Sequence, residues 1–317
     1  MDQFNFTMAN FTLSPPGLQS QPSLDSKHLA LLVVFSLFFS VGVPGNIAVI
    51  ILKPNWEHLS SLSQSLVLNL AVSDLLSLLT IPLWIHTCLH GWTFGLMACK
   101  ITSCVVYCSI YSNLLTVMGL SIQRYLVVVH QMGCRQVREK LLLVLLWLVA
   151  CILSIRHVVV KELVLDEQWA DCRSLYSSKG KQMAALMTEV LLGFGCFSVV
   201  AFLYIRIQIK INKAAFFNHP QTTRLVTSII LSFFILWLPY HTINVLSVAA
   251  ISLKNEFLMK FCTSTRRIFA AVIFVQSCLN PFLYAFTSLK VCAVCLKSKP
   301  LQQNQSMPPN PDLILVA

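Results

Sequence analysis

Seven long apolar runs occupy most of this chain of 317 residues. A helix needs about 20 apolar residues to cross the roughly 30 Å hydrocarbon core of a bilayer, and each run is long enough. Because lipid offers no water to the backbone, every amide must bond within its own segment, so the runs must be helices. We therefore predict an all-α membrane protein, a bundle of seven transmembrane helices. The runs cover about residues 29–52, 62–88, 97–130, 141–160, 183–209, 223–250 and 266–288.

The composition argues against an enzyme and against a transporter. Hydrophobic residues make up 56% of the chain and charged residues 11%, whereas an average soluble domain is about 25% charged. The loops are too short for a catalytic domain, and no pair of catalytic side chains stands at depth in the runs. A transporter or channel is the distant alternative, and it would need polar residues through several spans or helices broken at the midplane.

The runs divide the chain into a tail, a bundle and a second tail. We expect an extracellular N-terminal tail at 1–28, the receptor-sized bundle at 29–288 and a cytoplasmic C-terminal tail at 289–317. Asn5 and Asn10 each begin an N-glycan acceptor sequence, which favours an outside N-terminus. With the N-terminus outside, Lys and Arg are divided almost equally between the two sides of the membrane, so the positive-inside rule barely decides the orientation of the chain. The expected localisation is the plasma membrane, with multiple spans and the N-terminus extracellular.

Four of the twelve cysteines are placed where chemistry is expected. Cys99 lies at the outer end of the third run and Cys172 in the polar loop after the fourth. Both would face an oxidising compartment, where disulfides persist, so we predict a disulfide that pins this loop over the mouth of the bundle. Cys292 and Cys295 follow the last run and are candidates for palmitoylation. The alternative is that they are buried thiols of a short amphipathic eighth helix.

Short motifs stand in a fixed order along the runs, and together they resemble those of rhodopsin-type (class A) G-protein-coupled receptors over about residues 29–290. That resemblance implies an extracellular ligand, a heterotrimeric G protein as partner, arrestin as a further candidate partner, contact with membrane lipids and no nucleic acid. The motifs are Gly45-Asn46, Leu70-Ala71-Val72-Ser73-Asp74, Trp92-Thr93-Phe94-Gly95 ahead of Cys99, Gln123-Arg124-Tyr125, Trp147, Phe233-Phe234-Ile235-Leu236-Trp237-Leu238-Pro239 and Asn280-Pro281-Phe282-Leu283-Tyr284.

Asp74 is an acid within the second run, where a bare carboxylate is costly. It needs a cation or polar partners, and Asn113, Ser277 and Asn280 are the candidates. In the resembling family this cluster holds an allosteric sodium ion that favours the resting state. The alternative is a neutral, hydrogen-bonded Asp74. We expect no other metal and no cofactor.

The inner ends of the spans are expected to form the switch that meets the G protein. The resemblance implies that Arg124 contacts the G protein, with two tyrosines closing around it in the active state. Pro239 and Pro281 remove helix hydrogen bonds and kink their spans, so the inner end of the sixth span can swing. The expected coupling and switch residues are Arg124, Tyr125, Tyr204, Pro239, Pro281 and Tyr284.

The chain departs from the family pattern around this arginine. Gln123 stands where the family usually has an acid, and His219 falls near the position of the usual acidic partner in the sixth span. Both charged restraints on Arg124 are therefore missing. We expect a loosely held resting state with measurable signalling in the absence of ligand.

The outer mouth of the bundle is rich in cations and favours an anionic ligand. Val106 stands where an amine receptor carries an aspartate, and Phe274 where an opsin carries its retinal-binding lysine. Arginine and lysine at a partly desolvated mouth suit a carboxylate, and Arg156 is among them. An apolar and aromatic interior below suits a long apolar chain. The predicted ligand-binding residues are Tyr107, Lys161, Lys181, Glu189, Trp237, Arg266 and Arg267.

Finer sequence detail is similar to the leukotriene B4 receptors of the chemoattractant branch. The resemblance implies an acidic lipid ligand such as leukotriene B4, an inhibitory-type G protein and a role in chemotaxis or inflammation. A chemotactic peptide and another acidic lipid are the alternatives. Glu189 lies one place from that family's usual acid, and Thr188 occupies the usual place. The matching segments are Trp237-Leu238-Pro239-Tyr240-His241 with Asn244, Arg266, Gln276 to Ala285, and Leu120 to Arg124 with Ile155-Arg156-His157.

Overall fold

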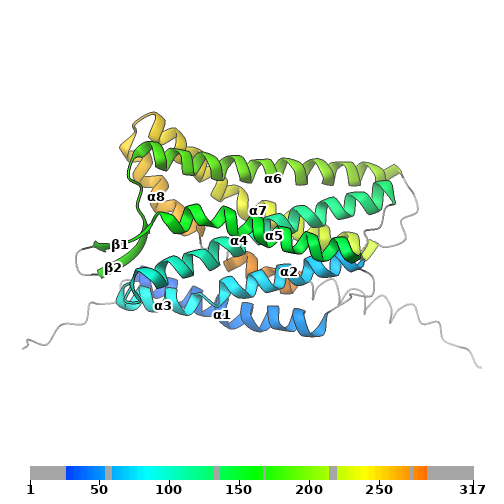
Figure 1. The fold of residues 1–317 in the computed structure, drawn as a ribbon, viewed down its shortest axis with the longest axis horizontal. Coiled ribbons are helices and arrows are strands. Elements are labelled where there is room, and N and C mark those ends of the chain that lie inside the picture. Colours follow the sequence, from blue (N-terminus) through cyan, green and yellow to red (C-terminus); the bar gives the residue numbers. More distant parts are fainter. Residues whose placement is uncertain are drawn as a thin grey trace, which may run out of the picture.

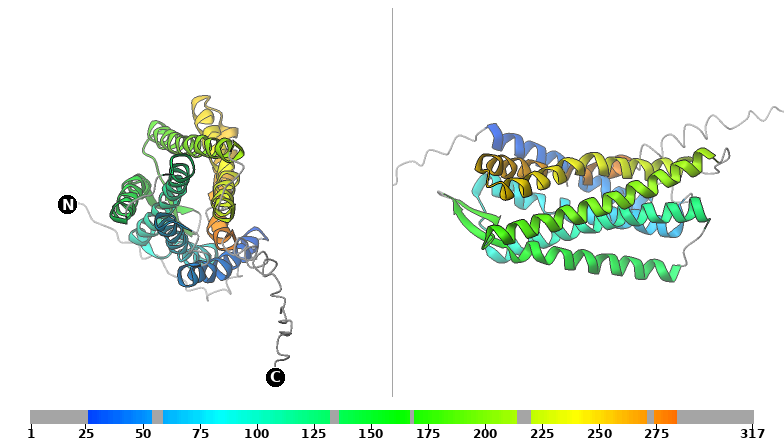
Figure 2. Two further views of the ribbon diagram at one scale, coloured as in Figure 1. Left: turned by 90° about the vertical axis from the view of Figure 1, so that its right-hand side faces the viewer. Right: turned by 90° about the horizontal axis from the view of Figure 1, so that it is seen from above.

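The computed structural model describes residues 26–53, 59–131, 136–166, 169–213, 220–270 and 274–283. Within these ranges the chain makes seven helical passes that lie side by side (Figure 1), and an end-on view shows them arranged as a ring (Figure 2). The helices are α1 (Ser26–Leu52), α2 (Ser61–Leu78), α3 (Ile81–His90), α4 (Gly95–His130), α5 (Gln136–Val159), α6 (Lys179–Lys213), α7 (Pro220–Ser252), α8 (Glu256–Ala270) and a last helical stretch at 274–283.

Six of the described helical stretches are long and apolar enough to cross a membrane by themselves. The seventh pass consists of α8 together with residues 274–283, so the label α8 marks the outer part of the seventh span. This pass begins at Glu256, well before the predicted start at residue 266. The prediction was wrong there because it followed apolar residues alone, whereas a helix that projects beyond the hydrocarbon can carry charge in its outer turns. Arg266 therefore lies inside the helix rather than at its start.

The second pass is broken in the middle. Pro82 lies in the first turn of α3 and has no backbone N–H to continue the hydrogen bonds of α2. The Thr80 amide and hydroxyl both donate to the Ser77 carbonyl, at 3.1 and 2.6 Å, and so close the last turn of α2. The single run predicted over 62–88 is therefore two consecutive helices, α2 and α3.

α4 is the central helix of the bundle, because it packs against α2, α5, α6, α7 and the strand β1. Its buried face carries polar and apolar residues, and among the apolar ones Val117 and Leu120 are 1% and 0% exposed. Leu66 of α2 and Phe233 of α7 meet this face from either side and belong to the same buried cluster. The core therefore fixes the positions of the polar side chains that α4 carries above and below it.

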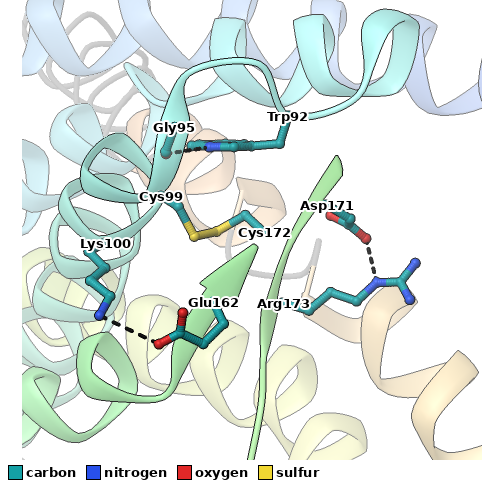
Figure 3. Close-up of a disulfide and its surroundings, with 8 residues drawn as sticks. All are labelled: Trp92, Gly95, Cys99, Lys100, Glu162, Asp171, Cys172 and Arg173. Carbon is teal, nitrogen blue, oxygen red and sulfur yellow. Dashed lines mark hydrogen bonds and ion pairs between the residues drawn. A yellow bond between two sulfur atoms is a disulfide. The ribbon is translucent and has the colours of Figure 1, made fainter. Parts of the chain in front are cut away.

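A β-hairpin covers one end of the bundle. Strands β1 (Lys161–Asp166) and β2 (Trp169–Ser174) pair antiparallel, in the segment predicted only as a polar loop. A disulfide joins Cys172 of β2 to Cys99 of α4, with the buried ring of Trp92 packed beside it (Figure 3). The Trp92 amide donates to the Ala170 carbonyl at 2.6 Å, and its indole N–H donates to the Gly95 carbonyl at 2.9 Å. The hairpin is thus held by one covalent bond and by Trp92.

Several predicted residues lie outside the described residues. They are Asn5, Asn10, His219, Tyr284, Cys292 and Cys295, as is the segment where an eighth amphipathic helix is expected.

Replacing Cys99 or Cys172 by Ala should destabilise the receptor by about 2–4 kcal/mol, because the bridge closes a long loop and limits the unfolded chain. Thermal unfolding of the purified receptor and its surface expression are the measurements. The double variant should be no less stable than either single variant, since each single change already removes the bond. Cys88→Ala is the matched control, because Cys88 is a free, half-buried cysteine at the same end. Wild-type stability in both single variants would show that the hairpin does not need the bond.

Candidate functional site

A buried carboxylate joins three helices at the disulfide-bearing end. Glu189 of α6 is 6% exposed and accepts hydrogen bonds from the Arg266 guanidinium of α8 at 2.9 and 3.0 Å. It also accepts from the Tyr240 hydroxyl and the Asn244 amide, each at 3.0 Å. Tyr240 and Asn244 are four residues apart, so they lie on one face of α7. A single acid therefore ties α6 to α7 and α8.

The same acid borders a stack of side chains from α4 and α5. His157 Nδ1 lies 3.8 Å from Glu189 Oε1, and the Tyr107 ring stacks on the imidazole with centroids 3.7 Å apart. The Tyr111 hydroxyl lies 2.9 Å from His157 Nε2 and also accepts from Arg156. Arg156 donates besides to a backbone carbonyl of α6, but its Nε has no partner among the described residues. Arg156 therefore differs from Arg266 in having no carboxylate beside it.

Lys161 is the third cation of this region. It begins β1 and is half-buried. Burial lowers the pKa of its ammonium, the nearby Arg266 adds to this effect, and Asp171 opposes it. Burial and the charge of Arg266 both disfavour the positive charge on Lys161. An anion placed near Lys161 and Arg266 would oppose both effects.

Two other predicted cations stand apart from this group. The Lys181 side chain is exposed in the first turns of α6 and makes no hydrogen bond or ion pair within the described part of the chain, although its backbone amide donates to Ser178. The side chain of Arg267 lies outside what the structure describes. The cationic group at the mouth is therefore Arg156, Lys161 and Arg266, with Glu189 paired to Arg266 and Asp171 near Lys161.

An aromatic layer lies below the charges. Trp237 is 6% exposed, and its ring centre lies 5.8 Å from that of Phe233 and 6.2 Å from that of His241. A Cβ on Gly193 would lie 2.0 Å from the His241 ring, so only glycine allows this imidazole to pack against α6. Trp237 Nε1 and His241 Nδ1 have no hydrogen-bond partner among the described residues. The layer is thus apolar in bulk and carries two unpaired polar atoms.

The Asp74 cluster assembles in the middle of the bundle. Asp74 is fully buried and accepts from Asn113 at 2.8 Å, Ser277 at 2.9 Å and Asn280 at 2.6 Å. The structure therefore brings all four predicted residues together, from α2, α4 and the 274–283 helix. Asn46 of α1 joins them, since its amide donates to the Ser277 carbonyl at 2.9 Å while its Oδ1 has no described partner. Oxygen atoms with a carboxylate among them are the ligands that hard cations prefer, so the cluster fits sodium.

Gln123 does not turn toward Arg124 at the opposite end. Its amide donates to Ser60 at 2.7 Å and its carbonyl accepts from Ser63 at 2.8 Å, so it holds the start of α2. The Nε and Nη2 atoms of Arg124 are buried and have no partner among the described residues. Gln123 therefore does not hydrogen-bond Arg124 here, because the serines at the N-terminus of α2 occupy its amide.

The other described switch residues have defined positions, but the tyrosines among them make no hydrogen bond to Arg124 within the described residues. Tyr204 of α6 is half-buried, and Tyr125 packs edge-on against His130 with ring centres 5.3 Å apart. Pro239 lies inside α7 and Pro281 inside the 274–283 helix. No hydrogen bond links Tyr204 or Tyr125 to Arg124 within the described residues, so the described parts of the switch remain separate here.

Sequence reasoning missed several members of these clusters. Tyr240 and Asn244 were quoted as motif residues, yet their spacing of four on α7 already placed them on one face toward a common partner. Asn46 was likewise quoted without a role. Tyr111 and the pair Ser60 and Ser63 carried no signal, because a contact between distant helices depends on how the helices pack.

Comparison with known proteins agrees with this architecture. The model of the 7 transmembrane receptor (rhodopsin family) matches residues 45–284. Leukotriene B4 receptor 1 of Homo sapiens is 32% identical over 280 residues, which cover 83% of this chain and 79% of the relative. C-C chemokine receptor type 8 of Mus musculus is 26% identical over 84% of this chain and 78% of its own. The C5a anaphylatoxin chemotactic receptor 1 of Canis lupus familiaris is 26% identical over 90% and 83%.

These matches confirm the predicted fold class and the resemblance to chemoattractant receptors, and they remove the transporter alternative. The family consists of receptors rather than enzymes, and its members act through a ligand and a heterotrimeric G protein. The family match spans most of the chain and ends within the predicted seventh span. Six of the described helical stretches are long and apolar enough to cross a membrane, as a multi-pass membrane protein requires. By its helices, its motifs and this match, the chain belongs to the rhodopsin family of seven-transmembrane receptors.

Proposed function

We propose that the chain is a receptor for an extracellular acidic lipid mediator such as leukotriene B4, which signals through an inhibitory-type G protein in chemotaxis or inflammation. The observation that carries this proposal is the charge at the mouth, where three cations, Arg156, Lys161 and Arg266, lie with two acids, Glu189 beside Arg266 and Asp171 near Lys161. A carboxylate ligand would complete this charge balance. The similarity to human leukotriene B4 receptor 1 supports the same class of ligand.

The layer below the charges suits the rest of such a molecule. Phe233, Phe197 and Trp237 offer apolar faces to a hydrocarbon chain. The unpaired Trp237 Nε1 and His241 Nδ1 suit a hydroxyl or carbonyl group carried on that chain, because a buried polar atom gains by finding a partner. We therefore expect a hydroxylated fatty acid to bind better than a saturated one of equal length.

The orientation of the bundle is part of the proposal. The Cys99–Cys172 disulfide marks the hairpin end as the one that faces an oxidising compartment. We infer that this end and the N-terminal tail are extracellular and that Arg124 lies at the cytoplasmic end, where its buried, unpaired guanidinium atoms would pair with a G protein once this end opens. Sodium at the Asp74 cluster and arrestin at the cytoplasmic end are further parts of the proposed mechanism.

A chemotactic peptide is the second candidate ligand, since the relatives include a C5a receptor and chemokine receptors. The receptor reconstituted in lipid nanodiscs with G protein separates the two. Leukotriene B4, its methyl ester, a saturated fatty acid and a formylated peptide are each tested for stimulated nucleotide exchange. Exchange with the free acid that is lost with the ester supports the proposal, and exchange with the peptide alone overturns it.

Changes at Glu189 and Arg266 should have opposite effects on the affinity for an acidic lipid. Arg266→Ala should weaken binding about ten- to hundredfold, because a charge-assisted hydrogen bond of about 1.5–3 kcal/mol is lost and Glu189 is left without its cation. Glu189→Gln should strengthen binding, since the carboxylate no longer competes for Arg266. Displacement of radiolabelled leukotriene B4 measures both.

The matched control for these changes is Lys100→Ala, because Lys100 is a cation at the same end that pairs with Glu162 outside the cluster. Adding Glu189→Gln to Arg266→Ala should restore part of the affinity, because it removes the repulsion between the Glu189 carboxylate and the ligand carboxylate. If Glu189→Gln lowers the affinity for the acidic lipid as much as Arg266→Ala does, Glu189 binds the ligand itself. The hypothesis that Glu189 competes with the ligand for Arg266 is then wrong.

Ligand-free signalling should be measurable, because no acid pairs with Arg124 among its described neighbours. Gln123→Asp should lower it by adding a charge-assisted contact of about 0.5–2 kcal/mol, and a shift of about 1.4 kcal/mol changes the ratio of states tenfold. His219→Glu should lower it further, and Arg124→Ala should abolish coupling while preserving surface expression. The assay is basal nucleotide exchange at matched surface expression.

Gln123→Asn separates the charge from the lost contacts with Ser60 and Ser63, since it has the shape of aspartate without the charge. It should not lower basal exchange. Basal exchange at the level of mock-transfected membranes, unchanged by Gln123→Asp, would rule out a loosely held resting state.

A further inference from the structure

Two histidines lie side by side on the last turn of α3. His86 and His90 are four residues apart, which places them on one face of the helix. Their ring centres are 4.7 Å apart and the ring planes differ by 33°. His86 Nδ1 is buried and has no hydrogen-bond partner among the described residues, while His90 is exposed. Neither imidazole belongs to the Glu189 network or to the Asp74 cluster.

The separation of the rings matches that of two ligands on one metal ion. A metal–nitrogen bond to imidazole is about 2.0–2.1 Å long, so the ion would lie about 3.2 Å from each ring centre. Two such vectors that meet at about 95° span the 4.7 Å observed, and this angle lies between those of octahedral and tetrahedral coordination. Two histidines spaced by four on a helix are also the arrangement that helical zinc sites use.

The surroundings indicate which metals fit. The Phe94 ring lies on the His86 side of the pair with centroids 4.7 Å apart, so this imidazole has limited freedom to turn. No third His, Cys, Asp or Glu side chain gathers with the pair within the described residues. The remaining ligands would be water, which suits an ion that binds imidazole strongly. Cu²⁺, Ni²⁺ and Zn²⁺ meet this requirement, in an order led by Cu²⁺, whereas Mg²⁺ and Ca²⁺ prefer oxygen ligands.

The fold presents this pair at the disulfide-bearing end. α3 ends at His90, and the amide of the capping residue Gly91 donates to the Thr87 carbonyl at 2.9 Å. Trp92 follows at once and packs beside the disulfide. An ion that bridges His86 and His90 would brace the last turn of α3 next to this anchor, because it binds only when that turn is helical.

We propose that His86 and His90 form a transition-metal site that binds one Cu²⁺ or Zn²⁺ ion and stabilises the outer end of α3. The site needs no assumption about the lipid or peptide ligand. If the hairpin end is extracellular, the ion comes from outside the cell.

The test uses the full-length receptor, purified without a histidine tag and reconstituted in nanodiscs. Binding of Cu²⁺, Zn²⁺ and Mg²⁺ is measured by isothermal titration calorimetry, and the Cu²⁺ complex is examined by electron paramagnetic resonance. We expect one ion held by two imidazole nitrogens, Cu²⁺ bound more tightly than Zn²⁺, and no response to Mg²⁺. His86→Ala and His90→Ala should each lower the Cu²⁺ affinity of this site about a hundredfold, because the second ligand is lost.

His130→Ala is the matched control, since His130 is an exposed histidine at the opposite end of the bundle. It should leave the two-nitrogen signal intact. Thermal midpoints in a chelating buffer show that each variant is folded, and a Zn²⁺-dependent rise of the midpoint should be absent from both α3 variants. Equal binding by wild type and the doubly substituted receptor overturns the proposal. A signal that survives His90→Ala overturns the pairing as well.

Discussion

Two buried carboxylates determine how the helices of this receptor are held together. Asp74 takes hydrogen bonds from α4 and the 274–283 helix, and Glu189 takes them from α7 and α8. Asp74 is 0% exposed and Glu189 6%, and an unpaired polar group in such surroundings costs several kcal/mol. The helices that supply the donors therefore cannot move apart without a replacement partner. Apolar packing fills the space between Asp74 and Glu189, whereas the hydrogen bonds to the two acids specify which helices meet at each of them.

This arrangement would let the proposed acidic ligand act on the packing of the helices. A ligand carboxylate at the mouth would compete with Glu189 for Arg266, and Glu189 would then hold α7 through Tyr240 and Asn244 alone. Those two residues lie just beyond Pro239, on the helix whose inner end is expected to swing. A ligand shifts a conformational equilibrium only by the difference in its affinity for the two states. Exchange of partners at Arg266 is a source of that difference.

The sequence predicts contacts among motif residues better than contacts between helices that no motif marks. The spans could be predicted because backbone amides must be paired in lipid, which requires helices. The Asp74 cluster could be predicted because a carboxylate in a span needs polar partners, and the motifs offer few. The start of α8 could not, since a helix that leaves the membrane no longer needs apolar residues. Nor could the partner of Gln123, because Ser60 and Ser63 come near it only once α2 packs on α4. The His86–His90 spacing was visible in the sequence, but the unpaired Nδ1 became apparent only in the fold.

The contrast between Asp74 and Arg124 indicates what holds the resting state. Arg124 has buried guanidinium atoms without partners, so it contributes no ion pair among the described residues that would resist movement of the cytoplasmic end. Asp74 is fully hydrogen-bonded and links the same α4 helix to the 274–283 helix through Asn113 and Asn280. We therefore propose that the restraint lies in the middle of α4 rather than at its end. Because a cation at the Asp74 cluster would strengthen that restraint alone, basal activity in this receptor should depend on sodium more steeply than in a relative that carries an acid beside its arginine.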